Sequence, residues 1–273
     1  MGLALDSVVK LTRGVTMPIL GIGTAGPQGD ACIAAVREAL RVGYRLIDTA
    51  SMYGNEREVG IAVRESGVPR GEVFVTTKIA TPEQGPRSTP KALDESFRRL
   101  GLDYVDLYLI HWPARRKRIA TWEAMTPFLD RGLARSIGVS NFMVHHLEEL
   151  RVVKETPAVN QIELSPFLQQ EQVVGYCREQ GIQLEAYSPL TRGHRLNDPA
   201  IARIAAKYGK TPAQVLIRWS LQHGFVAIPK SARPERIREN SEVFDFALSS
   251  SDVQALDALE KGLHFDWDPS RVP

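Results

Sequence analysis

The feature that most limits the fold of this chain is a regular alternation of short apolar runs with helix-like segments. The apolar runs have strand character, and they lie near residues 18–20, 45–48, 73–78, 105–110, 135–139, 158–162, 182–187 and 225–228. The intervening segments place apolar residues every three or four positions, which is the spacing of one helix face. Eight strand–helix units in about 250 residues are typical of an α/β fold of the (β/α)8 TIM barrel type.

The ends of the chain add smaller features to this pattern. Two apolar runs between Ser7 and Thr16, around Arg13 and Gly14, predict a short N-terminal β-hairpin. A last helix is expected to end near residue 259, with Ser250 or Ser251 as its cap. No low-complexity linker or internal repeat interrupts the sequence, so residues 1–273 are expected to form a single barrel domain.

Composition excludes several classes of protein. The chain has 273 residues, 43% of them hydrophobic, which is enough for a large core. Its formal net charge is +2 and both signs are interspersed, so neither a nucleic acid nor an anionic membrane is expected as a partner. Cys32 and Cys177 lie among apolar neighbours and are expected to be buried thiols. With no signal-peptide pattern and no membrane-length apolar run, we expect a soluble, cytoplasmic monomer.

Groups that can do chemistry stand just after the predicted strands. Asp48, Lys78 and His111 close the second, third and fourth strands, and Tyr53 follows Asp48 by five residues. Taken singly, each has an ordinary alternative role, as a turn residue, a solvated lysine or a structural histidine. Because barrel active sites lie at the carboxyl ends of the strands, four such groups at one barrel mouth predict a site.

The four groups complement one another chemically. Asp48 can pair with Lys78, and the lysine charge beside a phenol is expected to lower the pKa of Tyr53 from its usual value of about 10. Tyr53 could then protonate a carbonyl oxygen or deprotonate an alcohol. His111 could orient that oxygen and donate a hydrogen bond to it. Neither a serine or cysteine nucleophile with its base nor a cluster of metal ligands is evident, so we expect no metal site.

A glycine motif near the N-terminus suggests a different fold. Residues 21–26 match G-x-G-x-x-G, and Asp48 follows at the distance expected of a dinucleotide-binding fingerprint in a doubly wound sheet. However, Pro27 and Gly29 stand where that fingerprint needs an uninterrupted helix N-terminus. The fingerprint would also leave Lys78 and His111 without a role. We therefore expect the glycines to let the first barrel loop approach a cofactor or substrate closely.

Motifs along nearly the whole chain resemble those of the aldo/keto reductases. The matching segments begin with Ile47-Asp-Thr-Ala50, Tyr53-Gly-Asn-Glu56, Thr76-Thr-Lys78 and Gly101 to Pro113. They continue with Gly138 to Phe142, Asn160-Gln161, Ala186 to Leu190, Ile228 to Ser231 and Arg236 to Asn240. The short length and residues 160–166 and 201–212 look most like bacterial 2,5-diketogluconate and methylglyoxal reductases.

The resemblance implies a catalytic tetrad of Asp48, Tyr53, Lys78 and His111 and an NADPH/NADP+ cofactor bound across the barrel mouth. Ser140, Asn141 and Gln161 would bind the nicotinamide carboxamide, and Tyr187 would stack on its ring. The remaining implied cofactor contacts are Gly23, Thr24, Asp48, Ser188, Leu190, Lys230, Ser231, Arg236, Glu239 and Asn240. Among these, Lys230, Ser231 and Arg236 would bind the 2′-phosphate and favour NADPH over NADH.

The resemblance implies that Ala25, Tyr53, His111 and Trp112 contact the substrate. Near this pocket the chain departs from the commoner family pattern in two places. Where many relatives carry an aromatic residue after the first-strand glycines, this chain has Ala25-Gly26. The loop from Pro113 to Thr121 is short and basic. It could be an ordinary solvated loop, or a positive rim formed by Arg115, Arg116 and Arg118 that favours anionic substrates.

Together these observations predict an NADPH-dependent reductase of an aldehyde or ketone, with a keto-sugar acid or methylglyoxal as substrate candidates. One alternative is a module that binds NADPH and regulates a partner with little turnover. Another is a Rossmann-type dehydrogenase, which eight strand–helix units disfavour. The C-terminal tail from His264 could fold over the barrel mouth or hang free.

Overall fold

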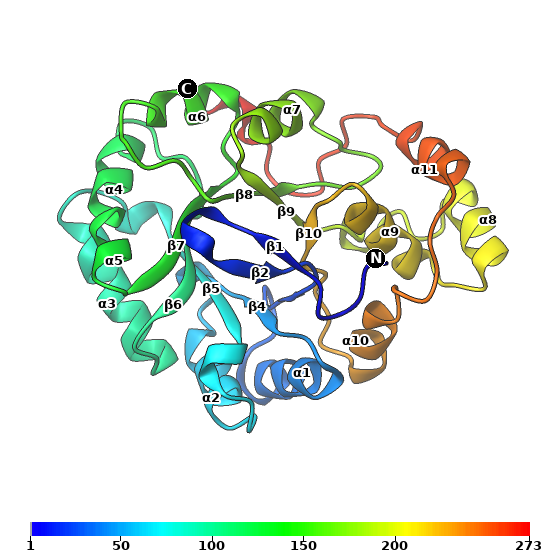
Figure 1. Cartoon of the computed structure of the whole chain (residues 1–273), viewed down its shortest axis with the longest axis horizontal. Coiled ribbons are helices and arrows are strands. Elements are labelled where there is room, and N and C mark those ends of the chain that lie inside the picture. The colour runs from blue at the N-terminus through cyan, green and yellow to red at the C-terminus, as the bar shows by residue number, and fades with distance from the viewer. Residues whose placement is uncertain (1) are drawn as a thin grey trace.

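The structure, a computed structural model, describes residues 2–273 and contains a barrel of eight parallel strands surrounded by helices (Figure 1). The strands follow one another in chain order around the sheet, from β3 to β10. Bridges from Leu20 to Ala227 and from Gly23 to Lys230 join the first barrel strand to the last and close the sheet. The (β/α)8 prediction is therefore confirmed, and the doubly wound alternative is wrong because the strand order never reverses.

The elements alternate along the chain. The strands are β1 (Val8–Lys10), β2 (Thr16–Pro18), β3 (Ile22–Gly23), β4 (Leu46–Asp48), β5 (Phe74–Ile79), β6 (Val105–Ile110), β7 (Ala134–Ser140), β8 (Val159–Glu163), β9 (Gln183–Tyr187) and β10 (Val226–Ala227). The helices are α1 (Gly29–Val42), α2 (Glu56–Arg64), α3 (Ser88–Leu100), α4 (Arg118–Met125), α5 (Pro127–Asp130), α6 (Val144–Leu150), α7 (Glu171–Glu179), α8 (Pro199–Tyr208), α9 (Pro212–Gln222), α10 (Pro234–Ser241) and α11 (Ser250–Asp257).

The predicted N-terminal hairpin is present as an antiparallel pair of β1 and β2. It lies across one end of the barrel, in the centre of the view in Figure 1. Arg13 and Gly14 both have positive φ in the turn between its strands, a conformation that Gly adopts without strain. Pro18, expected at the start of the first barrel strand, instead pairs with Val8 at the end of the hairpin.

The cap of the last helix also differs from the prediction. Ser249 is the N-cap of α11, and its hydroxyl accepts a hydrogen bond from the backbone of Asp252. Sequence alone could not choose among three adjacent serines, because each can cap a helix.

Two apolar layers explain why the strands carry so much hydrophobic sequence. One cluster fills the barrel interior and contains Leu46, Phe74, Leu107, Leu109 and Val159. The larger cluster lies between the strands and the helices, with Ile47, Val75 and Tyr108 among its members. Alternate strand residues therefore face inward and outward. Both cysteines are free, buried thiols, as expected.

This alternation determines where the polar groups go. Asp48 is two residues beyond inward Leu46, Lys78 is four beyond inward Phe74, and His111 is two beyond inward Leu109. Each polar side chain thus continues an inward-facing row at the carboxyl end of its strand. Among residues 2–273, no helix combines the length and apolar character needed to cross a membrane.

Candidate active site

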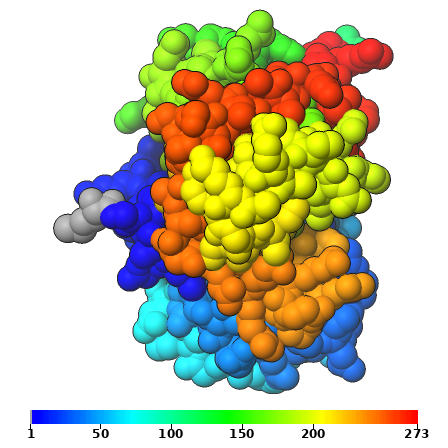
Figure 2. Space-filling model, turned by 90° about the vertical axis from the view of Figure 1, so that its right-hand side faces the viewer, coloured from blue at the N-terminus to red at the C-terminus, as the bar shows by residue number. Residues whose placement is uncertain are grey.

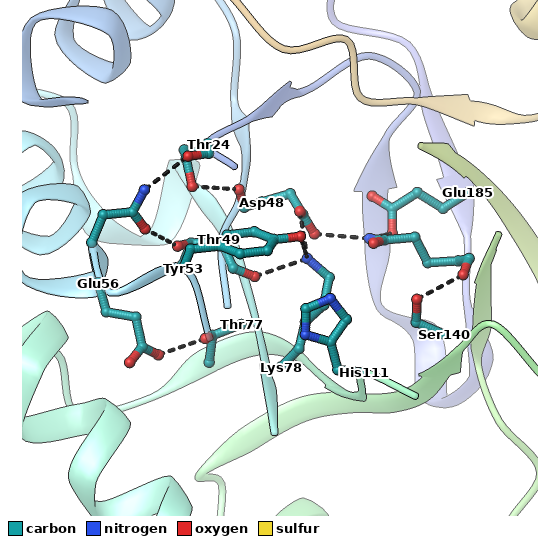
Figure 3. Close-up of polar contacts among 12 residues, drawn as sticks. Thr24, Asp48, Thr49, Tyr53, Glu56, Thr77, Lys78, His111, Ser140 and Glu185 are labelled. Atoms are coloured by element: carbon teal, nitrogen blue, oxygen red, sulfur yellow. Dashed lines mark hydrogen bonds and ion pairs between the residues drawn. The ribbon is translucent and has the colours of Figure 1, made fainter. Parts of the chain in front are cut away.

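The four groups expected to form the tetrad lie together inside the carboxyl end of the barrel (Figure 3). Lys78 Nζ donates to Asp48 Oδ1 over 2.5 Å and to the Thr49 carbonyl over 2.9 Å. It also lies 3.4 Å from the Tyr53 hydroxyl oxygen. The Tyr53 and His111 rings meet edge to face with centroids 5.5 Å apart. Asp48 and Lys78 are fully buried, so their attraction is little weakened by water.

The pKa of Tyr53 differs from the expectation. Burial raises it above its usual value, and the lowering contributed by Lys78 is smaller than this effect. Our prediction of a net lowering was therefore wrong, because it considered the lysine charge and left out desolvation. Burial also raises the pKa of Asp48, against the opposing effect of Lys78. Around neutral pH, Tyr53 is consequently a neutral phenol with a proton to donate.

His111 is held as a neutral imidazole. Burial lowers its pKa well below the usual range, and the Lys78 charge lowers it further. Its Nδ1 atom is buried and has no hydrogen-bond partner within residues 2–273. Asn141 Nδ2 donates to the His111 carbonyl over 3.0 Å and holds the backbone after β6. A neutral imidazole can donate one N–H to a polar atom in the site.

A buried polar clamp, not expected from the sequence, holds the loop that carries Tyr53. Asn55 Nδ2 donates to the carbonyls of Thr24 and Pro27, and its Oδ1 accepts from the Thr49 hydroxyl. Thr24, an expected cofactor contact, donates its own hydroxyl to the Asp48 carbonyl over 3.0 Å. These bonds tie the first and second strand ends together. The only sequence signal was an Asn between Gly54 and a helix start, which suggests a cap and not a clamp.

The residues expected around a nicotinamide form a connected network beside the tetrad. The Ser140 hydroxyl donates to the Gln161 carbonyl, and Asn141 Nδ2 donates to the Ser140 hydroxyl. The Tyr187 hydroxyl donates to Asn141 Oδ1 over 2.9 Å. Asn141 has φ +64°, an unusual conformation for a residue other than Gly and one often found at functional sites.

Gln161 connects this network to the tetrad and to a residue that was not expected in the site. Its Nε2 donates to Asp48 Oδ2 and to Glu185 Oε2, both over 2.8 Å. Glu185 comes from the middle of β9 and is fully buried. Burial raises its pKa to about 8, with the Asp48 charge acting in the same direction. An acidic residue two positions before inward Tyr187 was the available sequence signal, because it places a carboxyl inside the barrel.

The remaining expected cofactor contacts lie along the mouth beyond β9 and β10. Ser188 and Leu190 are half-buried in the turn after β9, and Ser188 has φ +48°. Lys230 and Arg236 are exposed at the end of β10 and on α10, whereas Ser231 and Asn240 are buried. Glu239 accepts a hydrogen bond from the Thr211 hydroxyl. A Cβ added to Gly23 would lie 3.1 Å from the Ile228 carbonyl, so β3 and β10 approach closely here.

A cavity of about 490 Å³ opens beside the tetrad and is lined by Thr81, Trp112, Pro113, Ala114, Arg115, Trp267 and Val272. Tyr53 and His111 do not line it directly, but Trp112 stacks on His111 with centroids 6.2 Å apart. Ala25, an expected pocket contact, is exposed and is not among these lining residues. The lining is mostly apolar, with Arg115 as its charged member.

The C-terminal tail folds over the mouth. The Glu163 carboxylate at the end of β8 accepts hydrogen bonds from the backbone of Phe265 and Asp266. Trp267 packs edge to face on Trp112 with centroids 5.0 Å apart. The Val272 carbonyl accepts hydrogen bonds from the Nε2 atoms of His145 and His146. Figure 2 shows the last residues, in red, on the side of the molecule opposite the blue N-terminal residues.

The three arginines of the basic loop after β6, for which the sequence allowed either a solvated loop or a positive rim, lie in different environments. Arg118 is buried, with its guanidinium bonded to Glu149 and to the Pro273 carbonyl. Arg116 is exposed, and Arg115 is the member of the three that lines the cavity. The rim hypothesis is therefore wrong for Arg118, since α4 begins at this residue and turns its side chain towards α6. In the part of the chain that the structure describes, no three His, Cys, Asp or Glu side chains gather to hold a metal ion.

Comparison with known proteins identifies the family. Residues 19–261 match the Aldo/keto reductase family. The chain is 49% identical to "Glyoxal reductase" of Bacillus subtilis, over 100% of this chain and 99% of the relative, and 44% identical to "Morphine 6-dehydrogenase" of Pseudomonas putida, over 97% and 95%. A solved aldo-keto reductase from a Medee basin deep-sea metagenome library has a TM-score of 0.93 and 42% identity, over 97% of this chain and 99% of that chain. The chain belongs to the aldo/keto reductase family and is an oxidoreductase that acts on carbonyl groups.

Proposed function

We propose that the protein reduces a small aldehyde or ketone to the alcohol with NADPH, and that Tyr53 supplies the proton. The observation that carries this proposal is the group formed by Asp48, Lys78, Tyr53 and His111 at the barrel mouth. When bound, NADPH supplies hydride to the carbonyl carbon. The protein's own groups then have to stabilise negative charge on the carbonyl oxygen and protonate it.

Each member of the tetrad has a role in that proton transfer. Tyr53 is neutral around neutral pH, so its hydroxyl can donate to the developing alkoxide. Lys78 lies 3.4 Å from the same hydroxyl and stabilises the phenolate that remains. Asp48 holds the ammonium in place over 2.5 Å. His111, kept neutral by burial, can donate an N–H to the carbonyl oxygen and orient it.

The residues beside the tetrad fit an extended dinucleotide. Ser140, Asn141 and Gln161 supply polar atoms for the carboxamide, and the half-buried Tyr187 ring supplies a flat surface for the nicotinamide. Gly23 and Thr24 border the same mouth, where the backbones approach closely. Ser188 and Leu190 would follow the pyrophosphate. Lys230, Ser231 and Arg236 would bind a 2′-phosphate, and Glu239 and Asn240 the adenine.

The substrate is proposed to be small and to have two adjacent carbonyl groups or a carboxylate beside the carbonyl. The B. subtilis relative, 49% identical, carries the name glyoxal reductase, which supports a dicarbonyl such as methylglyoxal. Arg115 on the cavity wall supports a carboxylated substrate such as a keto-sugar acid. Trp112 and Trp267 would enclose the apolar part. All of these groups come from one chain, and we propose that the protein acts as a monomer.

Measuring the oxidation of NADPH and NADH against methylglyoxal, a diketogluconate, simple aldehydes and keto acids tests this proposal. Turnover with at least one carbonyl compound, and a preference for NADPH, is expected. Tight NADPH binding without turnover of any carbonyl compound would contradict reduction and favour a regulatory module instead. The order of the substrates in this panel then identifies the class.

A matched pair of substitutions tests the role of Arg115. Arg115→Gln and Arg116→Gln each remove one exposed positive charge, but only Arg115 lines the cavity. We expect Arg115→Gln to raise the KM of a keto acid by about tenfold, a change that corresponds to the loss of one charge-assisted hydrogen bond. Its effect on a neutral aldehyde should be small, as should both effects of Arg116→Gln. Equal changes for the acid and the aldehyde would refute recognition of the carboxylate by Arg115.

A further inference from the structure

Glu185 is a buried carboxyl group that the proposed proton transfer does not use. Its side chain is fully buried, and in the sheet register it pairs directly with Gln161 on one side and Val226 on the other. Residues paired in parallel strands point to the same face, so Glu185 and Gln161 occupy one layer inside the barrel. Figure 3 shows Glu185 on the side of this layer away from Tyr53.

The carboxyl group is poorly satisfied in this place. Oε2 accepts from Gln161, whereas Oε1 is buried without a hydrogen-bond partner among the residues that the structure describes. Asp48 and Lys78 are the charged groups that act on it, and the Asp48 charge opposes a second negative charge nearby. Burying an unpaired polar atom costs stability, and an apolar residue would avoid this cost. The position of Glu185 therefore points to a role in the site.

Within residues 2–273, the Glu185 side chain makes one hydrogen bond, which it accepts from Gln161 Nε2. The two N–H bonds of Gln161 Nε2 are directed at Asp48 Oδ2 and Glu185 Oε2, each over 2.8 Å. Turning the amide over would place its oxygen against the Asp48 carboxylate, which has no hydrogen to donate, and this is electrostatically unfavourable. With one acceptor the amide could still swing about a single bond, but two acceptors hold it in one orientation.

That orientation leaves one polar atom of Gln161 available. Nothing within residues 2–273 donates a hydrogen bond to Gln161 Oε1. The amide of Asn141 is already engaged, since its Nδ2 donates to His111 and Ser140 and its Oδ1 accepts from Tyr187. Gln161 Oε1 is therefore the amide oxygen that is free to accept a hydrogen bond from the carboxamide N–H of a cofactor.

We propose that Glu185 is a positioning residue for the nicotinamide end of the site: it holds the Gln161 amide so that Oε1 accepts a hydrogen bond from the carboxamide N–H of the cofactor. This inference rests on the proposed function, because it concerns the same cofactor. Glu185 acts through Gln161 and touches neither the cofactor nor the substrate. It contributes to cofactor affinity, whereas Tyr53 and Lys78 contribute to turnover.

Calorimetric titration with NADPH tests the proposal in Glu185→Met, Glu185→Gln, Gln161→Ala and the double variant Gln161→Ala/Glu185→Met. Methionine has a similar volume but no acceptor, so we expect Glu185→Met to weaken NADPH binding by about tenfold, the value of one lost hydrogen bond. Glu185→Gln keeps an acceptor oxygen and should stay within about threefold of the wild type. In the Gln161→Ala background, Glu185→Met should have almost no further effect.

The possible failures give different results. Unchanged NADPH affinity in Glu185→Met, or an equal loss with and without Gln161, would overturn the proposal. If Glu185→Met does not fold, an unchanged affinity in Gln161→Ala would overturn it, because Gln161 would then not bind the cofactor. Absence of NADPH binding by the wild-type protein would instead overturn the proposed function. Thermal unfolding distinguishes a structural role, since Glu185→Met should keep or raise Tm while affinity falls.

Discussion

Charge at the barrel mouth is balanced among a few buried side chains. Lys78 carries one positive charge, and two carboxyl groups, Asp48 and Glu185, lie within its influence. Burial acts to lower the pKa of Lys78, but the attraction and hydrogen bond of Asp48, together with smaller effects of Tyr53 and Glu185, outweigh burial, and the pKa is raised. Protonation of Glu185 at neutral pH leaves Asp48 and Lys78 as one ion pair. Such a balance keeps the ammonium available to the Tyr53 hydroxyl.

The raised pKa of Glu185 predicts a pH-dependent stability. Its pKa is about 8 in the folded protein and about 4.5 when unfolded, so the native state holds an extra proton between these values. Stability should therefore fall as pH rises through this window, by up to about 1.4 kcal/mol per pH unit. Glu185→Gln removes this term and should gain stability over the wild type as pH rises. Urea unfolding of the variant and the wild type at pH 5 and pH 8 measures this gain. If the two proteins differ in free energy of unfolding by the same amount at both pH values, the account is contradicted.

The sequence was sufficient to predict that the four groups of the proposed tetrad lie together, and insufficient to find the side chains that hold them. Asp48, Lys78 and His111 stand out because a polar residue continues an inward row of apolar ones. Asn55 and Glu185 were missed, because a buried polar partner is recognised only when the three-dimensional neighbours are known. The direction of the Tyr53 pKa was wrong for the same reason, since burial is a property of the whole site.

Among the elements, the C-terminal tail forms part of the wall of the cavity that is proposed to take the substrate. Glu163 at the end of β8 binds two backbone N–H groups of the tail, and Trp267 forms part of the cavity wall. The sequence left open whether this tail covers the mouth. Its few aromatic residues allowed both outcomes, and the deciding partner, Glu163, lies about a hundred residues earlier in the chain.

Two substitutions test the function of the tail. Glu163→Gln weakens the charge-assisted hydrogen bonds that the Glu163 carboxylate accepts from the tail backbone. Trp267→Ala removes part of the cavity wall and leaves those hydrogen bonds in place. We expect Trp267→Ala to raise the KM of an aromatic or branched aldehyde by about tenfold while changing NADPH affinity little. Glu163→Gln should increase protease cleavage within residues 264–273. Unchanged kinetics in Trp267→Ala would show that the substrate does not reach this part of the cavity.

The helices and strands themselves were largely predictable, and their boundaries differ for identifiable reasons. β6 has the expected bounds because its apolar run is continuous and buried throughout. The first barrel strand was predicted too early, at residues 18–20, because Pro18 belongs to the hairpin and pairs with Val8, whereas β3 begins at Ile22. The segment near residues 121–130 divides into α4 and α5 at Pro127, which cannot continue a helix begun upstream.

For the molecule as a whole, the N-terminal hairpin closes the end of the barrel opposite to the site. Leu11, Val15 and Met17 belong to the same apolar cluster as the barrel interior, so the hairpin caps that interior. The barrel itself closes where Gly21 donates to the Ala227 carbonyl. A Cβ added to Gly21 would lie 2.4 Å from Leu46 Cγ, so only glycine fits there. The glycine motif thus has a packing role in addition to any role at the mouth.

Substitution of this glycine tests barrel closure. Gly21→Ala should reduce the free energy of unfolding by about 1–3 kcal/mol, the usual cost of forcing an extra methyl group into a filled core. Gly71→Ala is the matched control, because a Cβ at Gly71 meets nothing within 4 Å and its φ is not in the left-handed region. Equal free energies of unfolding of the two variants in urea would contradict the close packing described where the barrel closes at Gly21.

The most direct test of the central claim is the turnover of Tyr53→Phe with NADPH and the best carbonyl substrate of the panel. The phenol is proposed to supply the proton, so kcat should fall by at least about a hundredfold. NADPH affinity should stay within about threefold of the wild type, because the hydroxyl is not a cofactor contact. Tyr104→Phe, at the opposite end of the barrel before β6, is the control and should leave both values unchanged. A kcat of Tyr53→Phe close to that of the wild type would contradict the assignment of Tyr53 as the proton donor.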